Sequence, residues 1–263
     1  MRVETVGDGP AEIAVVGGIH GDEPCGIHAV ETLLAERPAL DRAVTFVVAN
    51  EEAAEREVRY VDEDLNRAFP GDPDADTHEG RLAARLAAVV SGCQILSLHS
   101  TQSYGGMFAL TDYVDEYERA ICPHLSVDAV VETAAFSEGR LFSATDDLLE
   151  VECGFQGSER AADNALQVTR QFLAATGALA DGPTVEQPAL PVYRLVEPVP
   201  KTAADAYEVY ATNFAEVAPG ETYAAAGERE FVAEEPFYPV LMSPYGYEEV
   251  FGYTADRVGT LEA

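Results

Sequence analysis

Two histidines and two glutamates lie next to runs of apolar residues. His20 and Glu23 follow the run EIAVVGG, His99 follows CQILSL, and Glu152 lies in LLEVEC. In open parallel sheets, ligands bind beyond the carboxyl ends of the strands, so these side chains are expected to meet. Two histidines and one carboxylate make a zinc set that leaves a coordination position for water, as a catalytic site needs. A surface histidine beside a helix-start glutamate would give the same HxxE pattern, but the flanking glycines favour a ligand site because they leave room for one.

The segment RYVDEDLNRAFPG, residues 59–71, has no hydrophobic period and ends in a turn sequence, so it is predicted to be a loop. It holds Arg59, Asn66 and Arg67 in a chain that has few cations. Guanidinium groups bind carboxylates through two parallel hydrogen bonds, and asparagine adds a donor. The loop is therefore predicted to bind an anion. The alternative is a surface loop whose arginines pair with its own three acidic residues.

The first two thirds of the chain alternate between short apolar runs and helical patterns, as in a parallel sheet covered by helices. The expected strands include EIAVVGG, TFVVAN, CQILSLHS and DDLLEVEC, and the expected helices are CGIHAVETLLAE, EGRLAARLAAVV, DEYERAICPHL and ERAADNALQVTRQFLAATG. After Gly177, prolines and short runs such as VYRLV, EVYATNF and EFVAEE predict strands of a small β module. The fold class is therefore α/β, with a catalytic domain over residues 1–180 and a β-rich domain over residues 181–263.

The charge of the chain is strongly negative: 16 basic and 47 acidic residues give a formal charge of −31. Such an excess repels nucleic acid and anionic lipid, so neither is an expected partner. A surface poor in lysine and rich in acids suits a halophilic protein, because concentrated salt screens the self-repulsion. The chain has no apolar signal segment and no run long enough to span a membrane, so a cytoplasmic location is expected. A homodimer is the default expectation for its assembly.

Four segments occur in the order GGIHGDEPCG, RYVDEDLNRAFPG, LSLHST and LEVECGFQGS. Together they resemble the succinylglutamate desuccinylase/aspartoacylase family, which is related to the zinc carboxypeptidases, over residues 11 to about 176. The resemblance implies a carboxypeptidase-like fold whose mixed, mostly parallel sheet has helices on both faces. It also implies one Zn²⁺ per chain and a C-terminal β domain that caps and narrows the active-site channel.

The resemblance further implies roles for the residues near the metal. His20, Glu23 and His99 match the zinc ligands, Glu152 matches the general base, and Arg59 matches the arginine that polarises the scissile carbonyl.

Other residues match positions that bind the substrate. Asn66 and Arg67 match the pair that binds its free carboxylate, and Tyr247 matches a tyrosine that reaches in from the β domain, although Tyr245 lies two residues away. Relatives that act on dicarboxylic substrates carry a further arginine ahead of the base, and Arg140 is the best local candidate for it.

The expected function is that of a zinc-dependent hydrolase that cleaves the amide bond of a small anionic N-acyl amino acid, as an aspartoacylase or a succinylglutamate desuccinylase does. A metallocarboxypeptidase or an ester hydrolase on the same scaffold is the alternative among enzymes, and a β module that narrows the channel disfavours long peptides. A non-catalytic protein that binds a metal or a metabolite is the alternative from another class. Glu152 beside the three ligands argues against it, because a binder needs no base.

Overall fold

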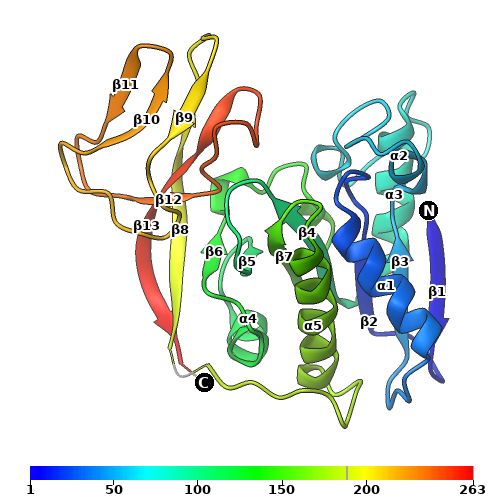
Figure 1. The fold of residues 1–263 in the computed structure, drawn as a ribbon. Helices are drawn as coiled ribbons and strands as arrows, with labels where there is room; N and C mark the ends of the chain where they lie inside the picture. Colours follow the sequence, from blue (N-terminus) through cyan, green and yellow to red (C-terminus); the bar gives the residue numbers. More distant parts are fainter. Residues whose placement is uncertain (188, 263) are drawn as a thin grey trace.

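The computed structural model describes residues 1–187 and 189–262, and its main feature is one large mixed sheet (Figure 1). In these residues ten strands pair in the order β1-β3-β2-β4-β7-β5-β6-β8-β13-β12. Their bounds are β1 Arg2–Val6, β2 Ile13–Gly17, β3 Val44–Val48, β4 Gln94–Thr101, β5 Phe108–Thr111, β6 Val130–Glu132, β7 Leu148–Phe155, β8 Leu190–Pro200, β12 Tyr238–Val240 and β13 Val250–Leu261. The α/β fold class and the mostly parallel sheet expected from the sequence are confirmed.

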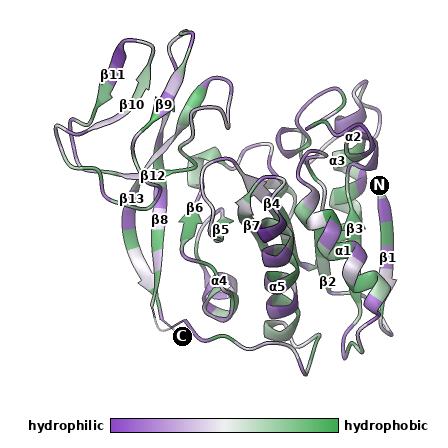
Figure 2. Cartoon of the chain, in the orientation of Figure 1, coloured by the Kyte–Doolittle hydropathy of each residue, from purple (hydrophilic) through white to green (hydrophobic). Residues whose placement is uncertain are grey.

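Helices cover both faces of this sheet. They are α1 Pro24–Glu36, α2 Glu51–Glu55, α3 His78–Val90, α4 Glu116–Ile121 and α5 Glu159–Ala175, with short 3₁₀ turns at η1 Leu65–Arg67, η2 Cys122–His124, η3 Ala134–Phe136 and η4 Leu141–Ala144. Alternate residues of a strand point to opposite faces, so Ile13 and Val15 of β2 share a core with α1, α4 and α5, whereas Ala14 and Val16 share one with α3. Hydrophilic and hydrophobic residues alternate along α5, whereas the strands β5 and β6 of the sheet are mostly hydrophobic (Figure 2). Within the described residues, no helix combines the length and the apolar character that a membrane span requires.

The C-terminal third of the chain contributes to the main sheet and also forms a small sheet of its own. β8 pairs in parallel with β6, and β13 runs antiparallel along β8 from Val250 to Leu261. A separate antiparallel sheet contains β9 Tyr207–Val209, β10 Thr222–Ala226 and β11 Arg229–Val232, and it packs on a third core of residues beyond Val199. Figure 1 shows this sheet at the end of the molecule farthest from β1. The division into two domains at residue 180 stays a prediction. β8, β12 and β13, which follow this residue, continue the main sheet.

The strands β1, β6, β10, β12 and β13 were not predicted from the sequence. β1, with the sequence RVETV, pairs antiparallel with β3 at the edge of the sheet and is mostly exposed. Its polar and apolar residues alternate over only five positions, which is too short a pattern to stand out from a loop.

Candidate active site

The predicted metal ligands converge at the carboxyl ends of three adjacent parallel strands. His20 and Glu23 lie in the turn from β2 to α1, and His99 lies in β4. Glu152 lies in β7, where it is the register partner of His99 on the neighbouring strand. The topology thus brings together side chains that are up to 132 positions apart, His20 and Glu152, as the rule for open parallel sheets predicts.

Glycines give the β2–α1 turn its tight shape. A Cβ atom on Gly17 would lie 2.4 Å from the carbonyl carbon of Gly26, so no other residue fits where the end of β2 meets the first turn of α1. Gly18 has a φ of +69°, which favours glycine. Glu23 is the residue before α1, yet its side chain makes no capping hydrogen bond because the carboxylate points into the site. The sequence GGIHGDEPCG therefore serves to aim His20 and Glu23 at one point.

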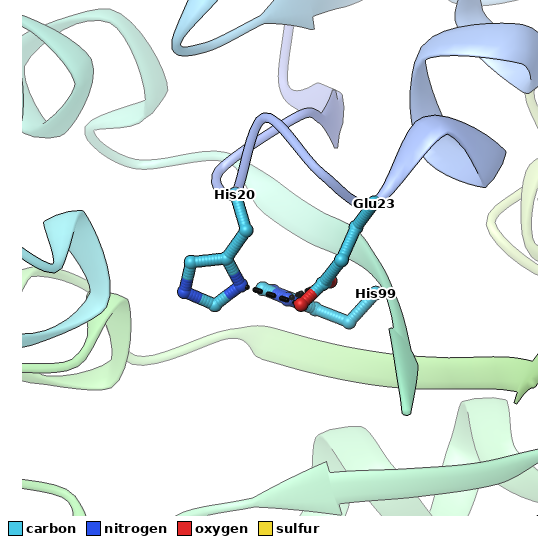
Figure 3. Close-up of side chains that lie close together, drawn as sticks. All are labelled: His20, Glu23 and His99. Carbon is cyan, nitrogen blue, oxygen red and sulfur yellow. Dashed lines mark hydrogen bonds and ion pairs between the residues drawn. The ribbon is translucent and has the colours of Figure 1, made fainter. Parts of the chain in front are cut away.

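The three side chains form a compact donor set that is consistent with a single metal ion (Figure 3). One ligand atom from each of His20, Glu23 and His99 lies within 4.8 Å of the others, and all three residues are buried. The two oxygens of Glu23 face the Nδ1 atoms of His20 and His99 at 2.8 and 3.2 Å. Two imidazoles and a carboxylate are the donor types that Zn²⁺ prefers, so the residues fit that ion.

The ring nitrogens that point away from Glu23 have hydrogen-bond partners of their own. His20 Nε2 lies 3.0 Å from Asp64 Oδ1, and His99 Nε2 lies 3.1 Å from Ser97 Oγ. Burial alone would lower the pKa of His20, but the carboxylates of Glu23 and Asp64 raise it to about 9. Such partners fix the orientation of metal-binding histidines. Asp64, which sequence reasoning treated only as a loop acid, is therefore part of the site.

Glu152 lies beside this set with an oxygen atom that has no partner. Its Oε2 atom is buried and has no hydrogen-bond partner among the residues that the structure describes. Burial, together with the charge of Glu23, raises the pKa of Glu152 to about 8. An unpartnered carboxyl oxygen with a raised pKa is suited to taking up a proton and giving it back.

The carboxylate of Glu79 holds the loop over residues 59–71 in place by accepting hydrogen bonds from its backbone. Glu79 is fully buried, and it accepts hydrogen bonds from the backbone N–H groups of Val61, Asp62 and Glu63 at 2.7, 3.0 and 3.3 Å. Asn50 Nδ2 donates a fourth bond at 2.9 Å. Burial alone would raise the pKa of Glu79, but these bonds hold it below its ordinary value. A loop that looks irregular in sequence is thus well ordered in the fold.

Asp64 links this loop to the metal ligands. Its Oδ1 atom also accepts the N–H of Asn66, and this bond caps the start of the 3₁₀ turn η1. The Arg59 guanidinium donates to Asp64 Oδ2 at 3.2 Å and to Glu23 Oε1 at 3.1 Å. The pairing of Arg59 with a loop acid, the alternative considered from the sequence, is therefore present, and it occurs at the metal-ligand cluster.

One pocket contains all nine residues selected from the sequence. They are His20, Glu23, Arg59, Asn66, Arg67, His99, Arg140, Glu152 and Tyr247, and their chemical roles stay predictions. Leu241, Ser243, Gly246 and Tyr253 complete the wall on the C-terminal side. Tyr245, the alternative to Tyr247, is 62% exposed and does not line the pocket.

Sequence reasoning missed further polar residues of the pocket and its support. Gln156 lines the pocket, and its Nε2 atom donates to the backbone oxygen of Asp22 at 2.9 Å. Glu150 is 1% exposed and pairs with Arg140 and Asn66 behind the pocket wall. Strand alternation places Glu150 on the same face as Glu152, which is the signal that could have found it.

The fold and the site together define a class of protein: an α/β deacylase fold with a His–Glu–His metal set. The sequence profile of the succinylglutamate desuccinylase/aspartoacylase catalytic domain matches residues 10–179. The chain therefore belongs to the succinylglutamate desuccinylase/aspartoacylase family, a family of zinc deacylases.

Solved structures show the same fold over nearly the whole chain. The ectoine utilization protein EutE (DoeB) from Ruegeria pomeroyi has 20% identity and a TM-score of 0.78, covering 98% of this chain and 88% of its own. Murine aminoacylase 3 has 21% identity and a TM-score of 0.76, covering 97% and 99%. The succinylglutamate desuccinylase of Vibrio parahaemolyticus has 19% identity and a TM-score of 0.71, covering 97% and 86%. No curated protein sequence matches the chain.

Proposed function

We propose that the protein is a zinc-dependent hydrolase that cleaves the amide bond of a small N-acyl amino acid. The observation that carries this proposal is the position of Glu152, a carboxyl group with an unpartnered oxygen, beside the buried donor set of His20, Glu23 and His99. The family supports it, because its members are zinc deacylases. The names of two structural neighbours, a succinylglutamate desuccinylase and an aminoacylase, agree with the same reaction class.

The residues of the pocket divide the work of amide hydrolysis. Zn²⁺ held by His20, Glu23 and His99 would supply a Lewis acid that makes water more acidic and polarises a carbonyl. Glu152 takes a proton from the attacking water at Oε2 and passes it to the leaving amine nitrogen. The Arg59 guanidinium, which borders the same pocket, donates to the carbonyl oxygen as negative charge develops there.

The remaining residues bind the substrate. Arg67 is exposed at the pocket and, with Asn66, is proposed to bind the free carboxylate of the amino-acid half. Arg140 and Tyr247 are proposed to contact the rest of the substrate. Burial raises the pKa of Tyr247 well above its ordinary value, so its hydroxyl stays protonated and remains a hydrogen-bond donor.

The alternatives differ in what the pocket must admit. A metallocarboxypeptidase has to receive a long peptide, whereas here Leu241, Gly246, Tyr247 and Tyr253 of the C-terminal part wall one side of the pocket. An ester hydrolase could use the same groups, and assays with matched esters distinguish it. A protein that only binds a metal or a metabolite has no use for the free oxygen of Glu152.

The test is release of free amine from N-acetyl and N-succinyl amino acids by the zinc-loaded protein in molar KCl. Glu152→Gln should lower kcat by a factor of about 10²–10⁴, the usual size of a general acid–base contribution, while zinc content stays unchanged. Glu159→Gln, an exposed change at the start of α5, serves as the matched control. Near-normal turnover in Glu152→Gln would remove Glu152 from the mechanism, and a fully zinc-loaded protein that releases no amine would refute the deacylase.

A further inference from the structure

A buried ion pair between Glu150 and Arg140 lies next to the pocket residues that are proposed to bind the substrate. Glu150 precedes Glu152 by two residues on β7, and its carboxylate is 1% exposed. One of its oxygens pairs with the guanidinium of Arg140, whose side chain is 11% exposed. The other oxygen accepts a hydrogen bond from Asn66 Nδ2 at 3.0 Å. The charge of Arg140 and the amide of Asn66 help to hold the pKa of Glu150 below its ordinary value against the effect of burial, so it is a fixed negative charge.

This carboxylate engages two groups that face the pocket. Arg140 lines the pocket, but its positive charge is balanced by Glu150. Asn66 also lines the pocket, and both polar atoms of its amide already have partners, since Oδ1 accepts the N–H of Leu141 at 3.1 Å. Arg140 therefore offers a substrate carboxylate no unbalanced positive charge, although its Nε atom has no hydrogen-bond partner among the described residues. Asn66 can still donate the second N–H of its Nδ2 atom.

The other two arginines of the pocket differ in whether a carboxylate pairs with them. Arg59 is paired with Glu23 and Asp64. Arg67 is exposed and donates to the backbone oxygen of Asn66 at 2.6 Å. Across residues 1–187 and 189–262, no carboxylate oxygen lies within 4.0 Å of the Arg67 guanidinium, so it is the arginine of this pocket without an ion pair.

A charge count gives the same result. Three arginines border the pocket, and the carboxylates that line or contact it are Glu23, Asp64, Glu150 and Glu152. With Glu152 ionised, as its role as proton acceptor requires, these groups leave one negative charge. A divalent metal ion changes this to one positive charge, which a single carboxylate neutralises. Asp22, next to Glu23, only lowers the balance further.

We infer that the substrate carries one carboxylate, bound by Arg67, and that its acyl group and amino-acid side chain are uncharged. This inference rests on the proposed deacylase function and narrows it. A second carboxylate would enter a pocket whose remaining arginines are already paired and would approach Glu150 and Glu152. Unpaired like charges in a desolvated site weaken binding strongly, and this repulsion gives the site its selectivity.

The experiment compares substrates that differ only in charge. N-acetyl-L-glutamine is set against N-acetyl-L-glutamate, which tests the amino-acid side chain, and N-succinamoyl-L-alanine against N-succinyl-L-alanine, which tests the acyl group. We expect kcat/KM to be at least about tenfold higher for the uncharged member of each pair, since juxtaposed like charges cost several kcal/mol. Higher kcat/KM for the dicarboxylic members would overturn the inference while leaving the deacylase intact.

A variant of Glu150 tests whether the ion pair causes the selectivity. Glu150→Gln keeps the shape of the side chain and frees the charge of Arg140, so the preference for the uncharged substrates should fall by about tenfold or more. The ratio of two kcat/KM values does not depend on the fraction of folded enzyme, so partial unfolding does not obscure the result. Glu36→Gln, an exposed change on α1, should leave the ratio unchanged. An unchanged ratio in Glu150→Gln would overturn the role of the ion pair.

Failure of the proposed function has a different signature. If the zinc-loaded protein released no amine from any of the four compounds, the deacylase itself would be refuted. Calorimetric titration with the same compounds then separates the two ideas. Binding of N-acetyl-L-glutamine but not of N-acetyl-L-glutamate would support a pocket for one carboxylate, and tighter binding of the dicarboxylate would overturn it.

Discussion

Replacing Glu79 by glutamine tests whether one buried carboxylate orders the loop that carries the substrate-binding residues. Each oxygen of Glu79 accepts two hydrogen bonds, so whichever oxygen becomes the NH₂ group of glutamine leaves two donors without an acceptor. Hydrogen bonds to a charged acceptor contribute about 1.5 kcal/mol each, so Glu79→Gln should lower the free energy of unfolding by about 3 kcal/mol. The loop bears Asn66 and Arg67, so KM should also rise in the folded variant.

The assay is urea denaturation in molar KCl, followed by circular dichroism, with steady-state kinetics on the folded protein. Glu159→Gln is the matched control, because this glutamate also lies in the first turn of a helix but is exposed. Loss of a charge near a helix N-terminus costs only about 0.5 kcal/mol. If Glu79→Gln lost no more stability than Glu159→Gln, the hydrogen bonds of Glu79 would not be what orders the loop.

Three further predictions concern metal affinity, pH and salt. Asp64→Asn should weaken zinc binding by about 10–100-fold, because it removes the carboxylate on His20 Nε2; competition with a chelator measures this, and unchanged affinity would limit Asp64 to capping η1. Burial, with the hydrogen bond shared with Asp115, raises the pKa of Glu118 from 4.5 to about 7. Because the folded protein then binds the proton more tightly than the unfolded chain, its stability should fall as the pH rises from about 4.5 to about 7. Denaturation across that range should show a flatter stability profile for Glu118→Gln, and identical profiles would contradict the prediction. The net charge of −31 predicts that the melting temperature rises between 0.1 M and 1 M KCl, as the screening length falls from about 10 Å to about 3 Å; a flat response would count against a halophilic protein.

The sequence predicted the elements whose pattern is local and strong. β2, β3, β4 and β7 are apolar runs bounded by polar or glycine-rich segments, and α1, α3 and α5 have clear helical periodicity. The edge strand β1 is short and alternates, and it becomes a strand only because β3 pairs with it. The partition of the C-terminal strands between two sheets depends on contacts distant in sequence, such as β6 with β8, which no local pattern encodes.

The residues of the pocket were predictable where a chemical type coincided with a strand end or a family motif. Asp64 and Gln156 lie within those same motifs, yet their positions toward His20 and the backbone of Asp22 depend on how two loops fold over each other. The role of Glu79 could not be predicted from the sequence. Glu79 lies in the first turn of α3 and supports the site only by accepting hydrogen bonds from the backbone of a loop that is distant in sequence.

Glu150 and Glu152 show why residue type and spacing alone do not assign a role. Both are glutamates on one face of β7, where Glu150 is buried and Glu152 is half-buried. Arg140 and Asn66, which come from other segments, occupy both oxygens of Glu150 and keep it ionised, whereas Glu152 has an unpartnered oxygen and a pKa raised to about 8 by burial and by the charge of Glu23. The same change to glutamine should therefore act differently at the two positions: at Glu152 it removes a proton carrier and lowers kcat for every substrate, whereas at Glu150 it alters the ranking of substrates by charge.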